Sequence, residues 1–358
     1  MCKSLVVGRS HSIYCILPPH MLEHIAKKGD EKQRARAIDT LSTDHTMRQF
    51  RSVQAASFTQ RRAMPMPAAA APSAHRSIYT ANQSETLPGA IVRAEGAGAS
   101  GDVCVDEAYD GLGATFEFYL EVFHRNSIDD AGLPLLGTVH YGQDYDNAFW
   151  NSQQMVFGDG DGTLFNRFTI AVDVIGHELT HGVTEHTAGL NYLGQAGALN
   201  ESVSDVFGSL IKQYVKKQTA DQADWLIGEG LLAKGVNGVA LRSMKEPGTA
   251  YDDPTLGKDP QPDHMSKYVH TTQDSGGVHI NSGIPNRAFY LAAVEIGGQA
   301  WVKAGRIWYE TLNDSHIKPS STFKGFAQLT VSNANRLYGA NSAESAAVTK
   351  AWKEVGVL

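Results

Sequence analysis

Three histidines and two glutamates lie within the thirteen residues VIGHELTHGVTEH, which run from Val174 to His186. His177 and His181 are four residues apart, so on a helix both imidazoles lie on one face, within reach of a single ion. Glu178 lies next to the first histidine and can act at the same site. This HExxH pattern is typical of zinc sites at which a glutamate serves as a general base.

A catalytic zinc site takes three protein ligands and leaves a fourth position open for water. We expect the third ligand on the next helix, which follows a glycine-rich turn that reverses the chain. Glu201, in the segment NESVSD, lies 24 residues after His177 and would face the histidines if the two helices pack antiparallel. Asp205 lies four residues later on the same face and can accept a hydrogen bond from a liganding histidine. Glu185 and His186 point elsewhere and are expected at the helix surface.

The elements that must position these residues follow from the periodicity of apolar residues. The chain begins with a small helical unit, continues as a β-rich half, and ends as an α-rich half, with HELTH at the junction of the two halves. The expected helices are residues 18–28, 30–41, 107–123, 170–186, 199–216 and 287–296, with further helical segments from 301 to the end. The expected strands are residues 91–96 and 137–142, and a pair of short strands within 141–162. The run GDGDG, residues 158–162, predicts a tight turn, because it lacks the later acidic ligands of a calcium-binding EF-hand loop.

Several motifs in a consistent order resemble the thermolysin family of metalloproteases. They are HELTH and GALNESVSD and also YDNAFW, LRSM and GGVHINSGIPN, and the resemblance extends from about residue 78 to the C-terminus. It implies a zinc-dependent endopeptidase with one Zn²⁺ per chain. It also implies an α+β fold in which the zinc site lies in the cleft between a β-rich N-terminal half and an α-helical C-terminal half.

The resemblance implies catalytic roles for residues that match the family positions. Glu178 would act as the general base, Tyr192 and His279 would stabilise the oxyanion, and Asp274 would orient the imidazole of His279. Taken alone, these residues have plainer interpretations. Tyr192 could be an aromatic that packs on a loop, and His279 alternates with Val278 and Ile280 like a half-exposed strand residue.

The resemblance also implies how a peptide would be bound. Asn147 and the backbone carbonyl of Ala148 would hold the peptide backbone, and Arg242 would bind the carbonyl of the residue that follows the scissile bond. Alone, Asn147 could be a turn residue and Arg242 a surface charge. The family positions that line the pocket for that residue's side chain are all apolar here: Phe165, Phe168, Val174 and Leu241. Cleavage before Leu, Ile, Val or Phe is therefore expected.

The sequence departs from the family at a site where thermolysins bind calcium beside the active-site helices. Asp173, Asp224 and Glu229 match ligand positions, but Lys212 and Leu226 occupy two others. A lysine ammonium beside carboxylates can replace a cation with its own charge. We expect this double calcium site to be lost or reduced, with Lys212 helping to fill it. The sequence makes no prediction about calcium sites elsewhere in the chain.

The N-terminal segment differs from the rest of the chain in charge. Residues 1–75 carry eleven Lys and Arg against five Asp and Glu, whereas the remainder carries 20 against 33. A basic leader can dock on an acidic body, or it can be an independent tail. The leader is similar to the short propeptides of the protealysin-like branch of the family. We therefore expect a propeptide at residues 1–70 with a linker to about residue 76, a β-rich catalytic subdomain at 77–175, and an α-helical subdomain at 176–358.

A protease with its own leader is expected to be a zymogen. The leader would cover the cleft as an intramolecular inhibitor and would be cleaved off within the linker segment from Arg61 to His75. Pro18 and Pro19 would resist hydrolysis near the cleft. The Cys15 side chain either supplies a thiolate to the zinc or packs as a small apolar residue.

Two other functions are compatible with a zinc-binding HExxH motif. A catalytically inactive zinc-binding effector or binding module would not need Glu178, Tyr192 and His279 together. An exopeptidase would need an anchor for a free amino terminus, for which the sequence has no motif. The expected partner is a peptide or protein substrate. We expect no nucleic-acid partner and no membrane partner, and we expect the chain to be a monomer. The apolar patch Leu5–Val7 is too short for a standard signal peptide, so we expect export by a leaderless route, as the resemblance favours, or a cytoplasmic location.

Overall fold

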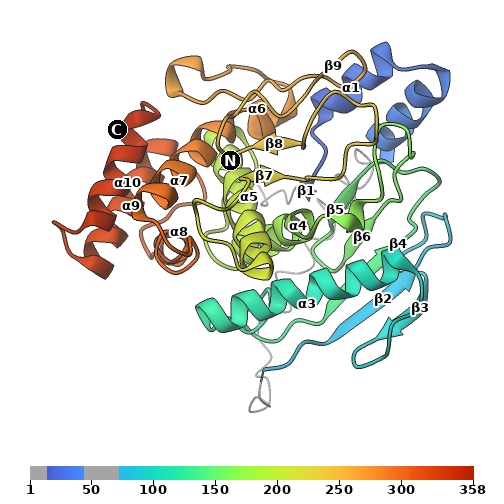
Figure 1. Ribbon diagram of the computed structural model, residues 1–358, viewed down its shortest axis with the longest axis horizontal. Helices are drawn as coiled ribbons and strands as arrows, with labels where there is room; N and C mark the ends of the chain where they lie inside the picture. Colours follow the sequence, from blue (N-terminus) through green and yellow to red (C-terminus); the bar gives the residue numbers. More distant parts are fainter. Residues whose placement is uncertain (1–13, 44–71) are drawn as a thin grey trace, which may run out of the picture.

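The structure is a computed structural model that describes residues 14–43 and 72–358. It has two halves with a helical pair between them. In Figure 1 a six-stranded sheet lies on one side, the C-terminal helices lie on the other, and α4 and α5 run through the centre. The predicted α+β architecture, with a β-rich N-terminal half and an α-helical C-terminal half, is confirmed, while the boundaries of the three predicted segments stay predictions. Among the described residues, no helix combines the length and apolar character needed to span a bilayer.

The sheet has the strand order β1-β5-β6-β4-β2-β3. Its strands are β1 (Tyr14–Cys15), β2 (Arg76–Thr80), β3 (Ala90–Ala94), β4 (Leu135–Val139), β5 (Ala148–Trp150) and β6 (Met155–Phe157). The antiparallel pair β5–β6 confirms the two short strands predicted within residues 141–162. Strand β1 was not predicted. It belongs to the leader and pairs antiparallel with β5, so the leader forms one edge of the sheet.

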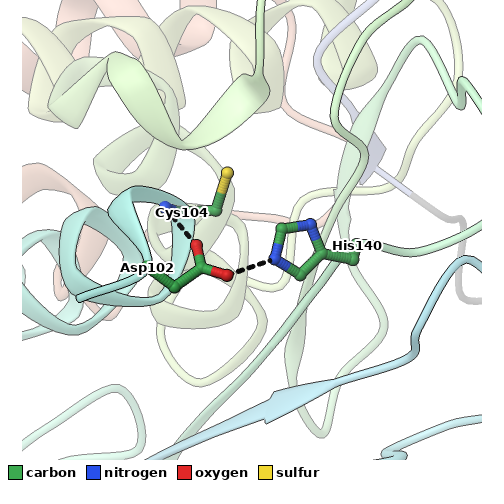
Figure 2. A group of neighbouring side chains, drawn as sticks. All are labelled: Asp102, Cys104 and His140. Atoms are coloured by element: carbon green, nitrogen blue, oxygen red, sulfur yellow. Dashed lines mark hydrogen bonds and ion pairs between the residues drawn. The ribbon is translucent and has the colours of Figure 1, made fainter. Parts of the chain in front are cut away.

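Helix α3 (Val103–Phe123) packs on the sheet (Figure 1). It begins four residues before the predicted start at Glu107. The reason is the N-cap residue Asp102, whose Oδ1 accepts the backbone N–H groups of Cys104 at 2.9 Å and Val105 at 3.4 Å. Figure 2 shows the bond to Cys104.

The leader contributes α1 (Pro19–Lys28), which agrees with the helix predicted over 18–28. A second helical segment covers residues 31–43 and extends slightly beyond the predicted 30–41. In Figure 1 this helical unit, in blue, lies beside the loop region of β9 (Asp252–Asp253) and away from the C-terminal helices.

The active-site helices are α4 (Val172–Glu185) and α5 (Gly194–Lys216). They approach closely because glycines face each other where they touch. A Cβ atom on Gly208 would lie 2.4 Å from the carbonyl oxygen of Asp173, and one on Gly176 would lie 3.3 Å from the Cα atom of Gly208. This close packing brings the carboxylate of Glu201 within reach of the α4 histidines.

The C-terminal half is completed by helices and two small hairpins. The helices are α6 (Asp274–Asn281), α7 (Gly283–Ile296), α8 (Ala304–Leu312), α9 (Phe323–Tyr338) and α10 (Ala343–Glu354). Strand β7 (Leu226–Ile227) pairs with β8 (Arg242–Ser243), and β9 pairs with β10 (Gly257–Lys258). The strand-like interpretation of the residues around His279 is wrong, because His279 lies in α6.

Candidate active site

The side chains of His177, His181 and Glu201 converge in the interior between α4 and α5. The two Nε2 atoms of the histidines are 3.0 Å apart. Glu201 Oε2 lies 3.5 Å from His177 Nε2, and Glu201 Oε1 lies 3.5 Å from His181 Nε2. All three side chains are buried. The residues predicted as zinc ligands therefore form one cluster of potential ligand atoms.

The hydrogen bonds around the two histidines engage both Nδ1 atoms and leave the Nε2 atoms facing each other. His177 Nδ1 donates to Asp205 Oδ1 at 2.8 Å, and His181 Nδ1 donates to Asn200 Oδ1 at 2.8 Å. The amide of Asn200 is oriented by its own donation to the Leu190 carbonyl at 3.1 Å. Burial, followed by the repulsion that a positive charge on His177 would exert, holds the pKa of His181 well below 6.5. A neutral imidazole whose Nδ1–H donates a hydrogen bond presents a lone pair at Nε2.

This arrangement fits a bound cation. Two imidazole lone pairs and a carboxylate face one another in a buried space, and Glu201 Oε2 has no hydrogen-bond partner among the described residues. Buried acceptors without donors are costly unless a cation compensates them. Two histidines and one glutamate are a donor set of catalytic zinc sites. Asn200 was missed by the sequence analysis, although its place beside Glu201 in NESVSD was a usable signal.

Glu178 is buried beside His177 on α4. The backbone N–H of Trp150, in β5, donates to Glu178 Oε2 at 3.0 Å. This bond fixes the carboxylate between the helix that carries the histidines and strand β5 of the sheet. Glu178 is thus oriented by the N-terminal half, while the preceding residue, His177, belongs to the metal cluster.

His279 and Tyr192 lie together beside Glu201 of the cluster. His279 Nε2 is 3.2 Å from the Tyr192 hydroxyl, which also donates to Glu201 Oε1. Asp274 holds His279 at two points, with Oδ1 2.6 Å from Nδ1 and Oδ2 accepting the backbone N–H at 2.9 Å. Burial lowers the pKa of His279, but the carboxylates of Asp274 and Glu201 outweigh it and raise that pKa above 6.5. The imidazole is therefore a strong donor.

The backbone between Asp274 and His279 explains this two-point contact. Ser275, Gly276 and Gly277 have φ values of 50°, 88° and 74°. This left-handed bend turns the Asp274 carboxylate back onto the helix that follows, and glycine adopts such φ values at little cost. The double glycine in GGVHIN is the sequence signal for the bend.

The leader crosses the cleft along the residues predicted to bind a peptide. Ile16 N–H donates to the Ala148 carbonyl at 3.2 Å, and Leu17 N–H donates to Asn147 Oδ1 at 3.1 Å. Arg242 Nη1 donates to the Ile16 carbonyl at 3.1 Å. The carbonyl of Cys15 faces His279 Nε2 at 3.2 Å.

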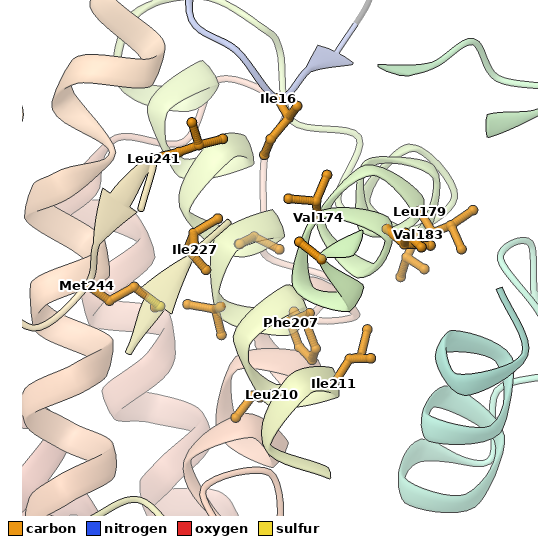
Figure 3. Close-up of a cluster of buried hydrophobic side chains, with 14 of the residues drawn as sticks. Ile16, Val174, Leu179, Val183, Phe207, Leu210, Ile211, Ile227, Leu241 and Met244 are labelled. Atoms are coloured by element: carbon orange, nitrogen blue, oxygen red, sulfur yellow. The ribbon is translucent and has the colours of Figure 1, made fainter. Parts of the chain in front are cut away.

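The side chain of Ile16 is buried in the apolar pocket predicted from the sequence. Figure 3 shows it next to Leu241 and Val174, and all three belong to one continuous core. Phe165 and Phe168 belong to the same core, with their ring centroids 5.9 Å apart. The four predicted pocket residues are buried, and they come from both halves of the molecule.

Arg242 is a buried residue, so the surface interpretation is wrong. Its Nε and Nη2 donate to Asp205 Oδ2 and Oδ1, each at 2.8 Å. Asn286 Nδ2 also donates to Asp205 Oδ2 at 2.8 Å. Burial raises the pKa of Asp205, but the charge of Arg242 and the hydrogen bond from His177 outweigh it and lower that pKa. Asp205 therefore stays ionised and joins the metal cluster to the peptide-binding residues.

Lys212 lies where the sequence predicts a replacement for calcium. Its Nζ is 3.0 Å from Asp173 Oδ2 and 2.7 Å from Asp224 Oδ1, and it donates to the Leu226 carbonyl at 2.7 Å. Glu229 contacts Lys216 at 3.4 Å. Burial lowers the pKa of Lys212, but Asp173 and Asp224 outweigh it and raise that pKa. The ammonium therefore stays charged among these carboxylates.

The remaining candidates lie outside the metal cluster. Cys15 packs in a small apolar cluster with Tyr141, Tyr145 and Phe149, in agreement with the packing interpretation. Glu185 is half-buried and accepts a hydrogen bond from the Ser152 hydroxyl at 3.2 Å. His186 is exposed, as expected.

Comparisons with known proteins agree with this geometry. The family described as "Thermolysin metallopeptidase, catalytic domain" matches residues 44–185, and "Thermolysin metallopeptidase, alpha-helical domain" matches residues 188–357. The chain is 54% identical over 351 residues to an "Extracellular metalloprotease" of Pectobacterium carotovorum subsp. carotovorum, covering 98% of each chain. It is 50% identical to "Protease PrtS" of Photorhabdus sp. (strain Az29), covering 96% of this chain and 91% of that protein.

A solved structure is similar over the same extent. It is the "Precursor of Protealysin, Metalloproteinase from Serratia proteamaculans", with a TM-score of 0.87 and 55% sequence identity. The match covers 96% of this chain and 100% of that chain. The likeness therefore includes both halves of the catalytic body and the leader.

Proposed function

Because the chain belongs to the thermolysin family of zinc metalloendopeptidases, we propose that it is a zymogen that cleaves before bulky hydrophobic residues once its leader is removed. One observation carries the proposal. The leader backbone from Cys15 to Leu17 runs antiparallel to β5 and makes hydrogen bonds with Asn147, Ala148 and Arg242. An extended peptide that adds to a sheet edge in this way is a common mode of substrate and inhibitor recognition.

The leader supports an assignment of the cleft to positions on a peptide. The Cys15 carbonyl faces His279, and the Ile16 N–H faces the Ala148 carbonyl. The Cys15–Ile16 bond thus occupies the position of a scissile bond, and the Ile16 side chain fills the pocket for the residue that follows it. Ile16 is fully buried there, and a bulky aliphatic or aromatic side chain gains the most from this burial. Leu, Ile, Val and Phe are the residues we propose after the cleaved bond.

In the proposed mechanism, His177, His181 and Glu201 would hold a zinc ion, which when bound would supply a Lewis acid for the substrate carbonyl and for a water molecule. Glu178 accepts the proton of the attacking water and passes it to the leaving amine. Its carboxylate is held ready by the Trp150 N–H.

The oxyanion that develops on the substrate needs preorganised donors. The Tyr192 hydroxyl and the His279 imidazole lie 3.2 Å apart and face the same space. Asp274 keeps His279 oriented and favours its protonated form. Arg242 binds the carbonyl that follows the cleaved bond, as it binds that of Ile16.

The leader is the proposed intramolecular inhibitor. We propose that activation occurs by cleavage within residues 61–75. Pro72 and Ser73 are exposed and therefore accessible to a protease. Residues 61–71 lie outside the described part of the chain. Pro18 and Pro19, which follow directly after the residues in the cleft, restrict the backbone there.

Two further features complete the proposal. Lys212 replaces the double calcium site, with its ammonium in contact with Asp173 and Asp224. The enzyme acts outside the cell, as its extracellular relatives do by name. Export by a leaderless route and a monomeric state stay predictions.

A direct assay tests the function. A blocked peptide with Gly-Leu at its centre should be hydrolysed between these two residues by the leader-free enzyme, and a zinc chelator should abolish the activity. A matched peptide with Gly-Asp at its centre should resist cleavage. If the leader-free, zinc-loaded protein cleaved neither peptide, this result would favour the catalytically inactive zinc-binding alternative.

A further inference from the structure

A second group of potential metal ligands lies in the N-terminal half. It consists of Asp102, Cys104 and His140, whose ligand atoms all lie within 4.8 Å of one another. The group shares no residue with the active-site cluster. A carboxylate, a thiolate and an imidazole are all ligands that zinc accepts, and thiolate and imidazole favour transition metals over calcium or magnesium.

Two elements distant in the sequence bring these side chains together. Asp102 caps α3 through Oδ1, and Cys104 lies in the first turn of that helix. His140 directly follows β4, and its Nε2 faces Asp102 Oδ2 at 3.0 Å (Figure 2). Two ligands of a tetrahedral zinc ion with bonds of ~2.0–2.1 Å are separated by roughly 3.3 Å. The 3.0 Å between His140 Nε2 and Asp102 Oδ2 is close to this ligand–ligand separation.

The other nitrogen of His140 is held by a second carboxylate. Nδ1 lies 2.9 Å from both oxygens of Asp159, in the GDGDG turn. This contact leaves Nε2 facing Asp102. A histidine that binds a metal through one nitrogen commonly donates its other N–H to a carboxylate, which fixes the ring. Asp159 supplies that contact.

Cys104 offers a buried sulfur ligand, with 6% of the residue exposed. Its thiol hydrogen-bonds with Thr169, and Sγ lies 3.8 Å from Asp159 Oδ1. The cluster is nevertheless open to small solutes. A shallow surface pocket is lined by Asp102 and His140 together with polar neighbours that include Thr80, Asn82 and Ser100. Solvent can therefore deliver an ion and complete its coordination with water.

We propose that Asp102, Cys104 and His140 bind one zinc ion or a similar divalent transition-metal ion, separate from the catalytic zinc, with Asp159 as a positioning residue. Binding would release the thiol proton and any proton on His140 Nε2 to solvent. The ion would link the first turn of α3 to the end of β4 and so stabilise the N-terminal half. The competing interpretation is an ion pair in which a protonated His140 lies between Asp102 and Asp159 without a metal.

Cobalt distinguishes the two interpretations. The full-length protein, stripped of metal and titrated with Co²⁺, should bind two equivalents. One of them should produce the near-ultraviolet charge-transfer band of a cobalt–thiolate bond. The active-site cluster contains two histidines and one glutamate, so that band reports only on a cysteine ligand.

Variants identify the cysteine. Cys104→Ser should lose the band and one equivalent of Co²⁺ while retaining the other equivalent and peptidase activity. Cys15→Ser, whose side chain packs against aromatic rings, and Cys2→Ser should keep the band. His140→Gln should shift or abolish it.

The wild-type protein alone can overturn the proposal, whatever the folding of the variants. Native mass spectrometry of the zinc-reconstituted full-length chain should find two zinc ions. A single zinc ion together with no cobalt–thiolate band would show that the cluster is only an ion pair. A band that persists in Cys104→Ser would also refute the assignment.

Discussion

Arg242 and Asp205 form a buried ion pair with two parallel hydrogen bonds, each 2.8 Å long. Asp205 also accepts the His177 Nδ1–H, and Arg242 also binds the Ile16 carbonyl. The pair therefore connects a metal ligand to the group that holds the peptide. Asp205 contacts the metal ligand and Arg242 contacts the peptide, so a change at Asp205 should act mainly on metal binding and a change at Arg242 mainly on substrate binding.

Arg242→Lys should lower kcat/KM by about 10- to 100-fold, because a lysine cannot hold Asp205 at two points while it binds the substrate carbonyl. The zinc content should change little. Asp205→Asn should lower zinc affinity by about 10- to 100-fold, because the neutral amide orients His177 less well. Steady-state kinetics and metal analysis of both variants check this. Equal losses of zinc in the two variants would argue against the separate roles.

The leader should dock less firmly in acid. Burial lowers the pKa of His20 from 6.5 to about 4, with Asp274 opposing this shift and His279 and Arg242 adding to it. A pKa lowered in the docked state means that docking is strongest above pH 6.5 and weakens as the pH falls toward 4. His20 Nε2 contacts the Tyr251 hydroxyl at 3.2 Å. His20→Gln retains a polar group for this contact but does not titrate.

Hydrogen exchange of the α1 amides measures this dependence. It should be run in a Glu178→Gln background that cannot process itself, and corrected for the intrinsic effect of pH. Exchange should accelerate on acidification in the wild-type leader and much less in His20→Gln. The same acceleration in both would remove His20 from this role.

Ile16→Asp should release the inhibition by the leader. A buried aliphatic side chain contributes about 1.5–3 kcal/mol, so its loss should raise the activity of the uncut chain by at least about tenfold. Ile38, in the same leader, is 56% exposed and provides the matched control Ile38→Asp. Peptidase activity of the intact chain, followed with its cleavage on gels, gives the comparison. Equal behaviour of the two variants would contradict inhibition through the pocket.

Lys212→Ala should destabilise the protein by about 3–5 kcal/mol, because it leaves the buried carboxylate of Asp173 without its cation. Lys212→Glu should restore part of the stability when Ca²⁺ is added, since it returns a carboxylate to the site. Thermal unfolding with and without Ca²⁺ measures both effects. If Ca²⁺ stabilised the wild-type protein as much as it stabilises Lys212→Glu, the proposal that Lys212 replaces bound calcium would be wrong.

Much of the catalytic body could be predicted from the sequence. The spacing of His177, His181 and Glu201 required only that two amphipathic helices pack antiparallel, which the glycine-rich turn indicated. The helix at His279 could not be predicted from alternation, because four residues with positive φ, Asp274 to Gly277, precede it and conceal the helical pattern. Helix α3 begins earlier than predicted because of a single capping residue, Asp102, which periodicity does not show.

The long-range polar contacts could not be predicted. Nothing local to LRSM shows that Arg242 is buried, because its partner Asp205 is 37 residues away. The partnership of Asn286 with Asp205 spans 81 residues. Strand β1 is only two residues long and exists because the edge of β5 is available to pair with it. Such contacts depend on the assembled fold rather than on local periodicity.

Glu178→Gln is the most direct test of the proposed chemistry, because the amide retains the size of the side chain but cannot accept the proton of the attacking water. We predict that the purified variant binds as much active-site zinc as the wild type and that its kcat on the blocked Gly-Leu peptide falls by at least about 100-fold. Zinc content and turnover measured on the same sample give the result. Full zinc occupancy with undiminished turnover would contradict the assignment of Glu178 as the base.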